Sequence, residues 1–158
     1  MHYKLDAEYT EGMKPYDDLA DRYTETAMSP PNRKNLNQRS HRRLPLFRSI
    51  LRTLPAACKD VVAWIDCEDT LINDPIVQNG DNNYYLRRLL NGQYNLSGTL
   101  FIDYRNQADF SDWNTIIYGH NMNNDTMFGI LPDYRKQELF DPHPVMYLLT
   151  RNRATEST

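Results

Sequence analysis

Apolar residues in the first third of the chain recur at the spacing of a helix face. Over residues 1–28 they follow one another mostly at intervals of three or four positions, the period of one helical face. Gly12 and Pro15 interrupt that face, so the pattern predicts two short helices rather than one. The same spacing returns over residues 44–54 and ends at Pro55. We therefore expect short helices in the part of the chain before Pro55.

Residues 29–43 separate these helical stretches and have the composition of a linker. Two prolines break any helix there, and the polar run that follows has no apolar face to bury. At the other end of the chain, residues 151–158 contain no apolar residue except Ala154 and are expected to be disordered. The sequence therefore divides into N-terminal helices with a basic linker at 1–54, a domain at 55–150 and a tail at 151–158.

From residue 55 onward the hydrophobic pattern changes to that of strands. Runs that are rich in β-branched residues or that alternate between apolar and polar positions predict five strands, at residues 61–65, 71–77, 96–104, 113–118 and 144–150. Trp64 and Phe101 are expected to be core residues of the first and third of these strands. Short helices followed by several short strands predict a mainly β fold with N-terminal helices packed on it.

Other local signals fall between the predicted strands. Pro75 lies inside the second run and donates no ladder hydrogen bond, so that run is expected at a sheet edge or at a strand start. A turn is predicted at 79–82, one helical turn within 84–90, and a helix over 126–140 that is interrupted near Pro132.

Length and composition fit one globular domain. The chain has 158 residues, of which 40% are hydrophobic and 25% are charged. No stretch approaches the roughly 18 apolar residues of a membrane span. Residues 1–28 also lack the apolar core of a signal peptide. We therefore expect a chain that neither crosses nor enters a membrane by itself.

Positive charge is concentrated in one segment. The net charge of the chain is −3, yet residues 33–52 hold seven basic residues and no acidic one. Such a segment is most simply a solvated or internally paired face. The alternative is that Arg39, Arg42 and Arg43 bind an anionic polymer such as a cell-wall polyanion. The overall charge gives no reason to expect nucleic acid as a partner.

The sequence offers no metal or cofactor site. Its two cysteines, Cys58 and Cys67, are too few for a disulfide scaffold and have no zinc-site spacing, so they favour two small, partly buried thiols. Phosphate-loop and serine-nucleophile motifs are both absent. A cluster of acidic residues lacks the spacing of a calcium loop, and solvated strand faces explain it as well. Its members are Asp66, Glu68, Asp69 and Asp74.

One histidine stands out from the other three. His120 follows a predicted strand through Gly119, which permits a sharp exit that carries the imidazole clear of the sheet. An imidazole titrates near neutrality and is therefore suited to move protons. On spacing alone, the simpler interpretation is a loop histidine that is bonded to a neighbouring carbonyl. His2 and His41 lie in segments expected to be mobile, and His143 lies between two prolines.

Six short blocks follow one another in order between residues 58 and 150. They read DVVAWI at 60–65, INDPIVQ at 72–78, NNYYL at 82–86, GTLFID at 98–103, NTIIYGH at 114–120 and MFGIL at 127–131. In order and spacing these blocks resemble the class B sortases, the cysteine transpeptidases of Gram-positive bacteria. The resemblance covers about 60% of the chain.

This resemblance implies a fold, a reaction and a place of action. The fold would be the eight-stranded sortase β-barrel. A cysteine thiolate would attack a carbonyl of a sorting-signal peptide, and an amine of the cell wall would then resolve the thioacyl enzyme. His120 would protonate the leaving amine and deprotonate the incoming one, while Asn82 and Leu86 would line the signal-peptide groove. The family acts at the extracellular face of the cell membrane and attaches surface proteins to the cell wall.

The chain also departs from the family pattern. In the family, the nucleophilic cysteine and an arginine that steadies the oxyanion lie well beyond the histidine. Neither is present here, because Cys58 and Cys67 precede His120 and because Arg151 and Arg153 follow it too closely. We therefore expect an incomplete, C-terminally truncated sortase barrel, without a membrane anchor, that is inactive alone. The alternative is a non-catalytic module that binds a peptide or a partner on a sortase scaffold.

Overall fold

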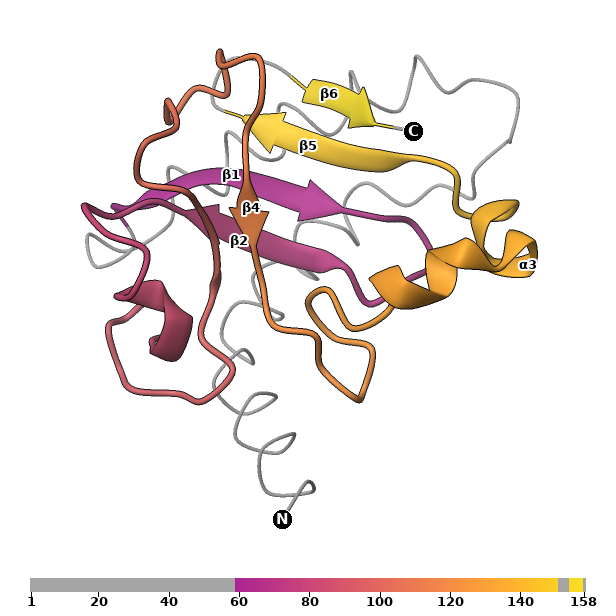
Figure 1. Ribbon diagram of the computed structural model, residues 1–158, viewed down its shortest axis with the longest axis horizontal. Coiled ribbons are helices and arrows are strands. Elements are labelled where there is room, and N and C mark those ends of the chain that lie inside the picture. Colours follow the sequence, from indigo (N-terminus) through magenta and orange to yellow (C-terminus); the bar gives the residue numbers. More distant parts are fainter. Residues whose placement is uncertain (1–58, 151–153, 158) are drawn as a thin grey trace, which may run out of the picture.

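A computed structural model describes residues 59–150 and 154–157 of this chain (Figure 1). The helices and linker expected over residues 1–54 lie outside the described residues, so binding of an anionic polymer by the basic segment stays a prediction. The described strands are β1 Val61–Asp66, β2 Asn73–Val77, β3 Leu100–Ile102, β4 Ile117–Tyr118, β5 Met146–Thr150 and β6 Ala154–Ser157. The described helices are two 3₁₀ turns, η2 Tyr85–Arg87 and η3 Leu131–Arg135, and the short α3 Gln137–Phe140.

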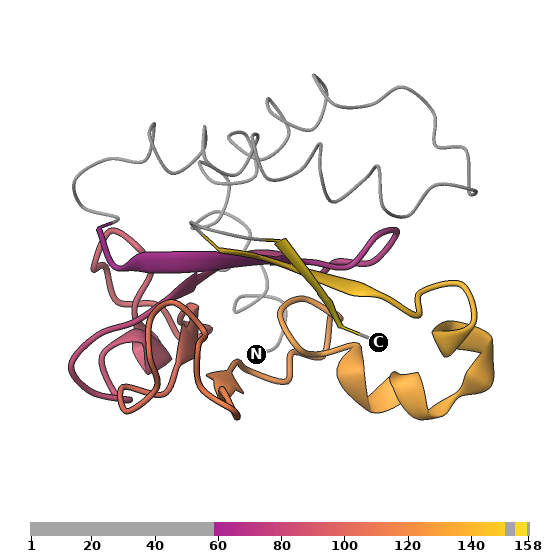
Figure 2. The same cartoon turned by 90° about the horizontal axis from the view of Figure 1, so that it is seen from above.

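The strands form one curled sheet in the order β4-β3-β2-β1-β5-β6. Only β2 and β3 pair in parallel, which requires the long crossover that contains η2. β4 crosses in front of β1 and β2 in Figure 1, so the sheet bends into a half-barrel. Figure 2 shows η2 and α3 on the same side of the strands β1 and β5. The mainly β, incomplete barrel expected from the sequence is confirmed.

The second strand is internal, which corrects the expectation from Pro75. β2 lies between β1 and β3, and Pro75 pairs with Trp64 of β1. Proline is tolerated there because β3 pairs only with Ile76 and Val77. Pro75 therefore stands in the part of β2 that has a strand on one side only.

The strand predicted over 96–104 is shorter than expected and is buried rather than half-buried. β3 spans three residues, and all three are buried. Gly98 stops the pairing before them, because it has a φ of +63° and packs on the backbone of η2. A Cβ atom at Gly98 would lie 2.4 Å from the carbonyl oxygen of Tyr85. Close packing between two backbones therefore replaces strand pairing at this position.

The strand predicted over 113–118 is also shorter than expected. β4 contains only its last two residues, and Trp113 is fully exposed. The side chain of Asn106 takes the place of a partner strand before β4. Its Nδ2 donates to the carbonyl of Asn114 at 2.8 Å, and its Oδ1 accepts from the backbone nitrogen of Ile116 at 3.0 Å.

Two further expectations need correction. The helix predicted over 126–140 is two short elements, η3 and α3, and Pro132 stands in the first turn of η3 rather than at the break. The break falls at Lys136, whose backbone is extended. Residues 154–157 of the tail that was expected to be disordered form β6, which pairs with β5 along four residues. The outer edge of β5 provides unpaired backbone groups, which favour such pairing irrespective of apolar content.

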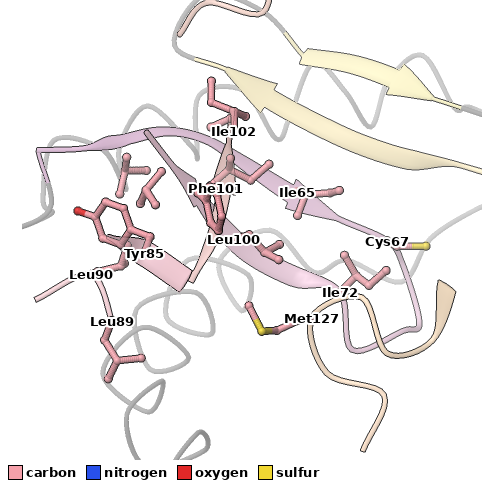
Figure 3. Close-up of a cluster of buried hydrophobic side chains, with 14 residues drawn as sticks. Ile65, Cys67, Ile72, Tyr85, Leu89, Leu90, Leu100, Phe101, Ile102 and Met127 are labelled. Carbon is pink, nitrogen blue, oxygen red and sulfur yellow. The ribbon is translucent and has the colours of Figure 1, made fainter. Parts of the chain in front are cut away.

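The core lies inside the curl of the sheet (Figure 3). It joins strands β1, β2 and β3 to the crossover residues Tyr85, Leu89 and Leu90. The ring of Phe101 stacks on that of Tyr118 at 5.1 Å between centroids, which joins β3 to β4. Among the described helices, none has the length and apolar content that crossing a membrane requires.

Trp64 and Phe101 are both 4% exposed, as expected for core residues. We predict that Trp64→Ala and Phe101→Ala each lower the free energy of unfolding by about 3–5 kcal/mol, because each leaves a large cavity. Trp113→Ala is the matched control and should change it by no more than about 0.5 kcal/mol. Chemical denaturation measures all three. A loss below about 1 kcal/mol at both core positions would contradict the strand register.

Candidate functional site

A buried carboxylate at the end of β3 organises one side of the site. Asp103 is 2% exposed, and its oxygens accept two hydrogen bonds from the guanidinium of Arg105, both at 2.9 Å. Asn82 Nδ2 donates to it at 3.0 Å and the hydroxyl of Tyr118 at 3.1 Å. The hydrogen bonds from Arg105 hold the pKa of Asp103 well below its usual range. The hydrogen bond to Asp103 in turn raises the pKa of Tyr118.

These bonds join three segments of the chain. Asn82 belongs to the turn after β2, Tyr118 lies in β4, and Arg105 begins the loop between β3 and β4. Asn82 is held at both ends, because its Oδ1 also accepts from the backbone nitrogen of Tyr104 at 3.0 Å. Asn82, which was expected to line the groove, therefore connects the turn after β2 to the residues that follow β3. A buried acid directly after an apolar strand, with an arginine two residues later, is the sequence signal that could have identified this cluster.

His120 stands two residues beyond β4 on a tightly held backbone. The Gly119 before it lies between Leu100 and Phe128, where a Cβ atom would come within 2.3 Å and 2.7 Å of their side chains. The backbone nitrogen of Phe128 donates to the carbonyl of His120 at 3.2 Å. The His120 side chain is half-buried. A histidine on such a rigid mount is suited to act on a bound substrate.

The imidazole of His120 faces η2. Its Nε2 lies 3.1 Å from the carbonyl oxygen of Leu86 and 3.0 Å from a guanidinium nitrogen of Arg87. The carbonyl is thus supplied by a residue distant in sequence rather than by a loop neighbour. The side chain of Leu86 is 39% exposed. Sequence reasoning did not single out Arg87, since the direction of a side chain on a single 3₁₀ turn cannot be derived from residue spacing.

The structure separates the two expected groove residues. β3 and β4 are antiparallel, so the residues that follow β3 and those that follow β4 lie at opposite ends of the pair. Asn82 contacts Asp103 beyond β3, whereas Leu86 contacts His120 beyond β4. Three strand residues span about 10 Å. The site therefore has two ends, and only Leu86 lies at the end that carries the histidine.

Gly98 fixes the position of the Leu86 carbonyl. A Cβ atom at Gly98 would lie 2.6 Å from that carbonyl oxygen, so no other residue fits without moving it. The backbone nitrogen of Thr99 donates to the carbonyl of Tyr85 at 3.0 Å, which holds η2 against the same segment. Backbone packing therefore fixes the position of the Leu86 carbonyl oxygen, the hydrogen-bond acceptor that faces His120.

Cys67 is not placed to serve His120. It is 1% exposed at the end of β1, where its sulfur lies 2.9 Å from the hydroxyl of Tyr134 (Figure 3 shows its place at the edge of the core). Burial, and then the hydrogen bond to Cys67, raise the pKa of Tyr134. Cys58 lies outside the described residues. A nucleophile must come within hydrogen-bond reach of its base, and the contacts of Cys67 are with other groups.

The described residues were compared with the side-chain clusters that bind metal ions. Within residues 59–150 and 154–157, no three histidine, cysteine or acidic side chains come together as a metal site would require. This holds for the acidic cluster of the sequence, in which Asp74 is buried in β2 while Asp69 is exposed in a turn. His143 contacts the backbone carbonyl of Glu68 at 2.9 Å through Nδ1.

A polar cleft of about 580 Å³ opens at the end of the sheet away from His120. Its walls come from the residues that precede β1 and that follow β2 and β3. They are Lys59, Asp60, Gln78, Asn79, Gly80, Tyr84 and Tyr104. Several of these polar groups are already engaged within the fold. Asp60, for instance, accepts from the hydroxyl of Tyr85 at 2.8 Å.

Sequence comparison links this region to known enzymes. No protein-family model matches the chain. It is 43% identical to sortase B of Listeria monocytogenes over 97 residues, which are 61% of this chain and 39% of the relative. It is 36% identical to sortase B of Staphylococcus aureus over 88 residues, which are 56% of this chain and 36% of the relative. The chain thus spans less than half the length of these curated relatives.

Comparison of folds gives the same result. The structure matches a Staphylococcus aureus sortase B–substrate complex with a TM-score of 0.63 at 31% identity, over 72% of this chain and 50% of that one. It matches a mutant form of Clostridium perfringens sortase B with a TM-score of 0.65 at 30% identity, over 75% of this chain and 56% of that one. The resemblance and the half-barrel fold predicted from the sequence are both confirmed.

The Asp103 cluster makes stability depend on pH in a defined direction. A carboxylate whose folded pKa is lowered stabilises the fold above its unfolded value of about 3.9, and this contribution is lost as the pH falls through the folded value. We predict that Asp103→Asn lowers the free energy of unfolding at neutral pH. The difference from the wild type should shrink below about pH 4.

Asp125→Asn is the matched control for Asp103→Asn. Asp125 is exposed and has a φ of +62°, a conformation that asparagine also tolerates. Denaturation curves collected between about pH 7 and pH 3 measure the effect. A difference between Asp103→Asn and the wild type that stays constant across this range would contradict the role given to the buried charge.

Proposed function

We propose that this chain, a homologue of the class B sortases over its aligned part, provides the peptide-contacting and histidine-bearing part of a sortase-type acyl transferase. The observation that carries the proposal is the placement of His120. The imidazole is half-buried, follows β4 on a tightly packed backbone, and faces the backbone carbonyl of Leu86. The activity, the substrate and the partners of the whole enzyme are proposals for this chain.

In the proposed reaction His120 moves protons for two successive acyl transfers. A cysteine thiolate attacks the carbonyl carbon of the sorting signal, the C–N bond breaks, and His120 gives a proton to the departing amine. An amine of the cell wall then attacks the thioester carbon, and His120 takes the proton from that amine as the thiolate leaves. The buried thiol of Cys67 is hydrogen-bonded to the hydroxyl of Tyr134, so the nucleophile would be a different cysteine.

The proposed partner is the sorting-signal peptide of a surface protein. A substrate complex exists for the Staphylococcus aureus sortase B to which this structure is similar. Leu86, whose carbonyl faces His120, has a partly exposed side chain on which an apolar residue of the peptide would rest. Asn82 would act mainly by holding the turn after β2 in place. The place of action would be the cell surface.

A second candidate function is a peptide-binding module without turnover. The observation in its favour is the position of Cys67, whose sulfur contacts Tyr134 and the carbonyl of Val145. Both candidates require the same peptide contact, and they differ only in whether these residues also complete a catalytic unit. A nucleophile and its base act as a unit, and loss of one member removes several orders of magnitude in rate.

We predict that the polypeptide of these 158 residues does not cleave a sorting-signal peptide by itself. Incubation with a fluorogenic peptide derived from the substrate of the Staphylococcus aureus relative, with and without a thiol alkylator, measures turnover. No fluorescence increase above the peptide alone is expected. Turnover that is abolished by the alkylator and by Cys67→Ala or Cys58→Ala would contradict the prediction and identify the nucleophile.

We also predict that the same peptide binds and that binding depends on Leu86. Leu86→Ala should weaken binding about fivefold to tenfold, as expected for partial loss of a buried leucine side chain. Leu71→Ala is the matched control, because Leu71 is 57% exposed in the turn between β1 and β2 and should not contribute. Fluorescence anisotropy of a labelled peptide measures both. Equal affinity for the two variants would remove the basis for the groove.

A further inference from the structure

Arg87 reaches the imidazole of His120 from η2. One of its guanidinium nitrogens lies 3.0 Å from Nε2 of His120 and also donates to the carbonyl of Leu96. The carbonyl oxygen of Leu86 lies 3.1 Å from the same ring nitrogen. Nε2 of His120 therefore stands between a cationic donor and a neutral acceptor.

A single ring nitrogen cannot serve both neighbours. If Nε2 carries the proton, it donates to the carbonyl of Leu86 and has no lone pair for Arg87. If Nε2 carries a lone pair, it accepts from Arg87 and the proton of the neutral ring resides on Nδ1.

Arg87 is held in place independently of His120. Its backbone carbonyl accepts from the nitrogen of Asn95 at 3.0 Å, and its side chain is tied to the carbonyl of Leu96. Backbone and side chain are thus both attached to the segment that follows η2. The guanidinium needs little further ordering to meet the ring, which reduces the entropy cost of the contact.

We propose that Arg87 is a positioning residue that donates to Nε2 of His120 and thereby keeps the proton of the neutral imidazole on Nδ1. A hydrogen bond from a charged donor is about twice as strong as one between neutral groups, which favours Arg87 over the carbonyl of Leu86. The inference deepens the proposed function and rests on it, because the lone pair of neutral His120 then lies on Nε2. Once its hydrogen bond from Arg87 is broken, Nε2 is the atom that takes up the proton of the substrate amine. The carbonyl of Leu86 remains an acceptor for a backbone N–H of a bound peptide.

The neighbouring arginine provides a matched control. The guanidinium of Arg88 lies over the ring of Tyr84, 5.0 Å from its centroid, and its Nη1 donates to the carbonyl of Gly92 at 3.5 Å. These contacts direct Arg88 away from His120. Removal of Arg88 changes the net charge by the same amount as removal of Arg87, so a general charge effect would alter both variants alike.

The test is the tautomer of His120, measured by long-range ¹H–¹⁵N correlation NMR on the ¹⁵N-labelled 158-residue chain. At about pH 8.5 an ordinary imidazole is neutral, so the two ring-nitrogen shifts report where the proton resides. The wild type should show the proton on Nδ1. Arg87→Met should lower the ratio of the Nδ1–H to the Nε2–H form about tenfold or more, as expected for loss of a hydrogen bond from a charged group.

Two further variants complete the test. Arg87→Lys keeps a cationic donor and should restore part of the Nδ1–H population, while Arg88→Met should match the wild type. A wild-type ring with its proton on Nε2 would overturn the inference, and so would an Arg87→Met spectrum equal to that of the wild type. The readout needs neither peptide nor turnover, so its failure is distinguishable from failure of the proposed function.

Discussion

One buried negative charge determines how the parts of this site are arranged. A carboxylate taken out of water is costly unless donors surround it, and Asp103 recruits them from Asn82, Arg105 and Tyr118. Asn82 comes from the turn after β2, Tyr118 from β4, and Arg105 from the loop that Asp103 itself begins. Because Tyr118 belongs to β4, the charge also fixes the strand from which His120 emerges. The ion pair beyond the end of β3 therefore helps to hold the strand from which the candidate acid–base group emerges.

Much of the fold could be predicted from the sequence because β1 and β5 are long apolar runs with few alternatives. The lengths of β3 and β4 could not, since tertiary contacts end them. Gly98 replaces strand pairing by backbone packing, and Asn106 satisfies the backbone before β4 with its side chain. Pro75 suggested an edge strand, but β2 is internal and tolerates the proline because the neighbouring β3 is too short to reach it. In each case a local rule was overridden by a partner distant in sequence.

The site was predictable to a similar degree. Gly119 before His120 indicated a rigid exit from a strand, and the resemblance to sortases identified Leu86. The sequence did not separate Asn82 from that pair, since nothing local indicates that its amide is occupied by Asp103. Arg87 escaped notice because its role follows only from the meeting of η2 with the residues after β4. Positions could thus be read from motifs, whereas hydrogen-bond partners required the three-dimensional arrangement.

The central claim is that a sorting-signal peptide binds at the end of the sheet that carries His120. Amide chemical-shift mapping during titration with the substrate peptide of the Staphylococcus aureus relative tests it most directly. The account predicts that shifts concentrate at Leu86, His120 and their neighbours in η2, while Asn79 and Tyr104 in the polar cleft stay unchanged. Shifts that concentrate in the polar cleft, with η2 and His120 unaffected, would contradict it.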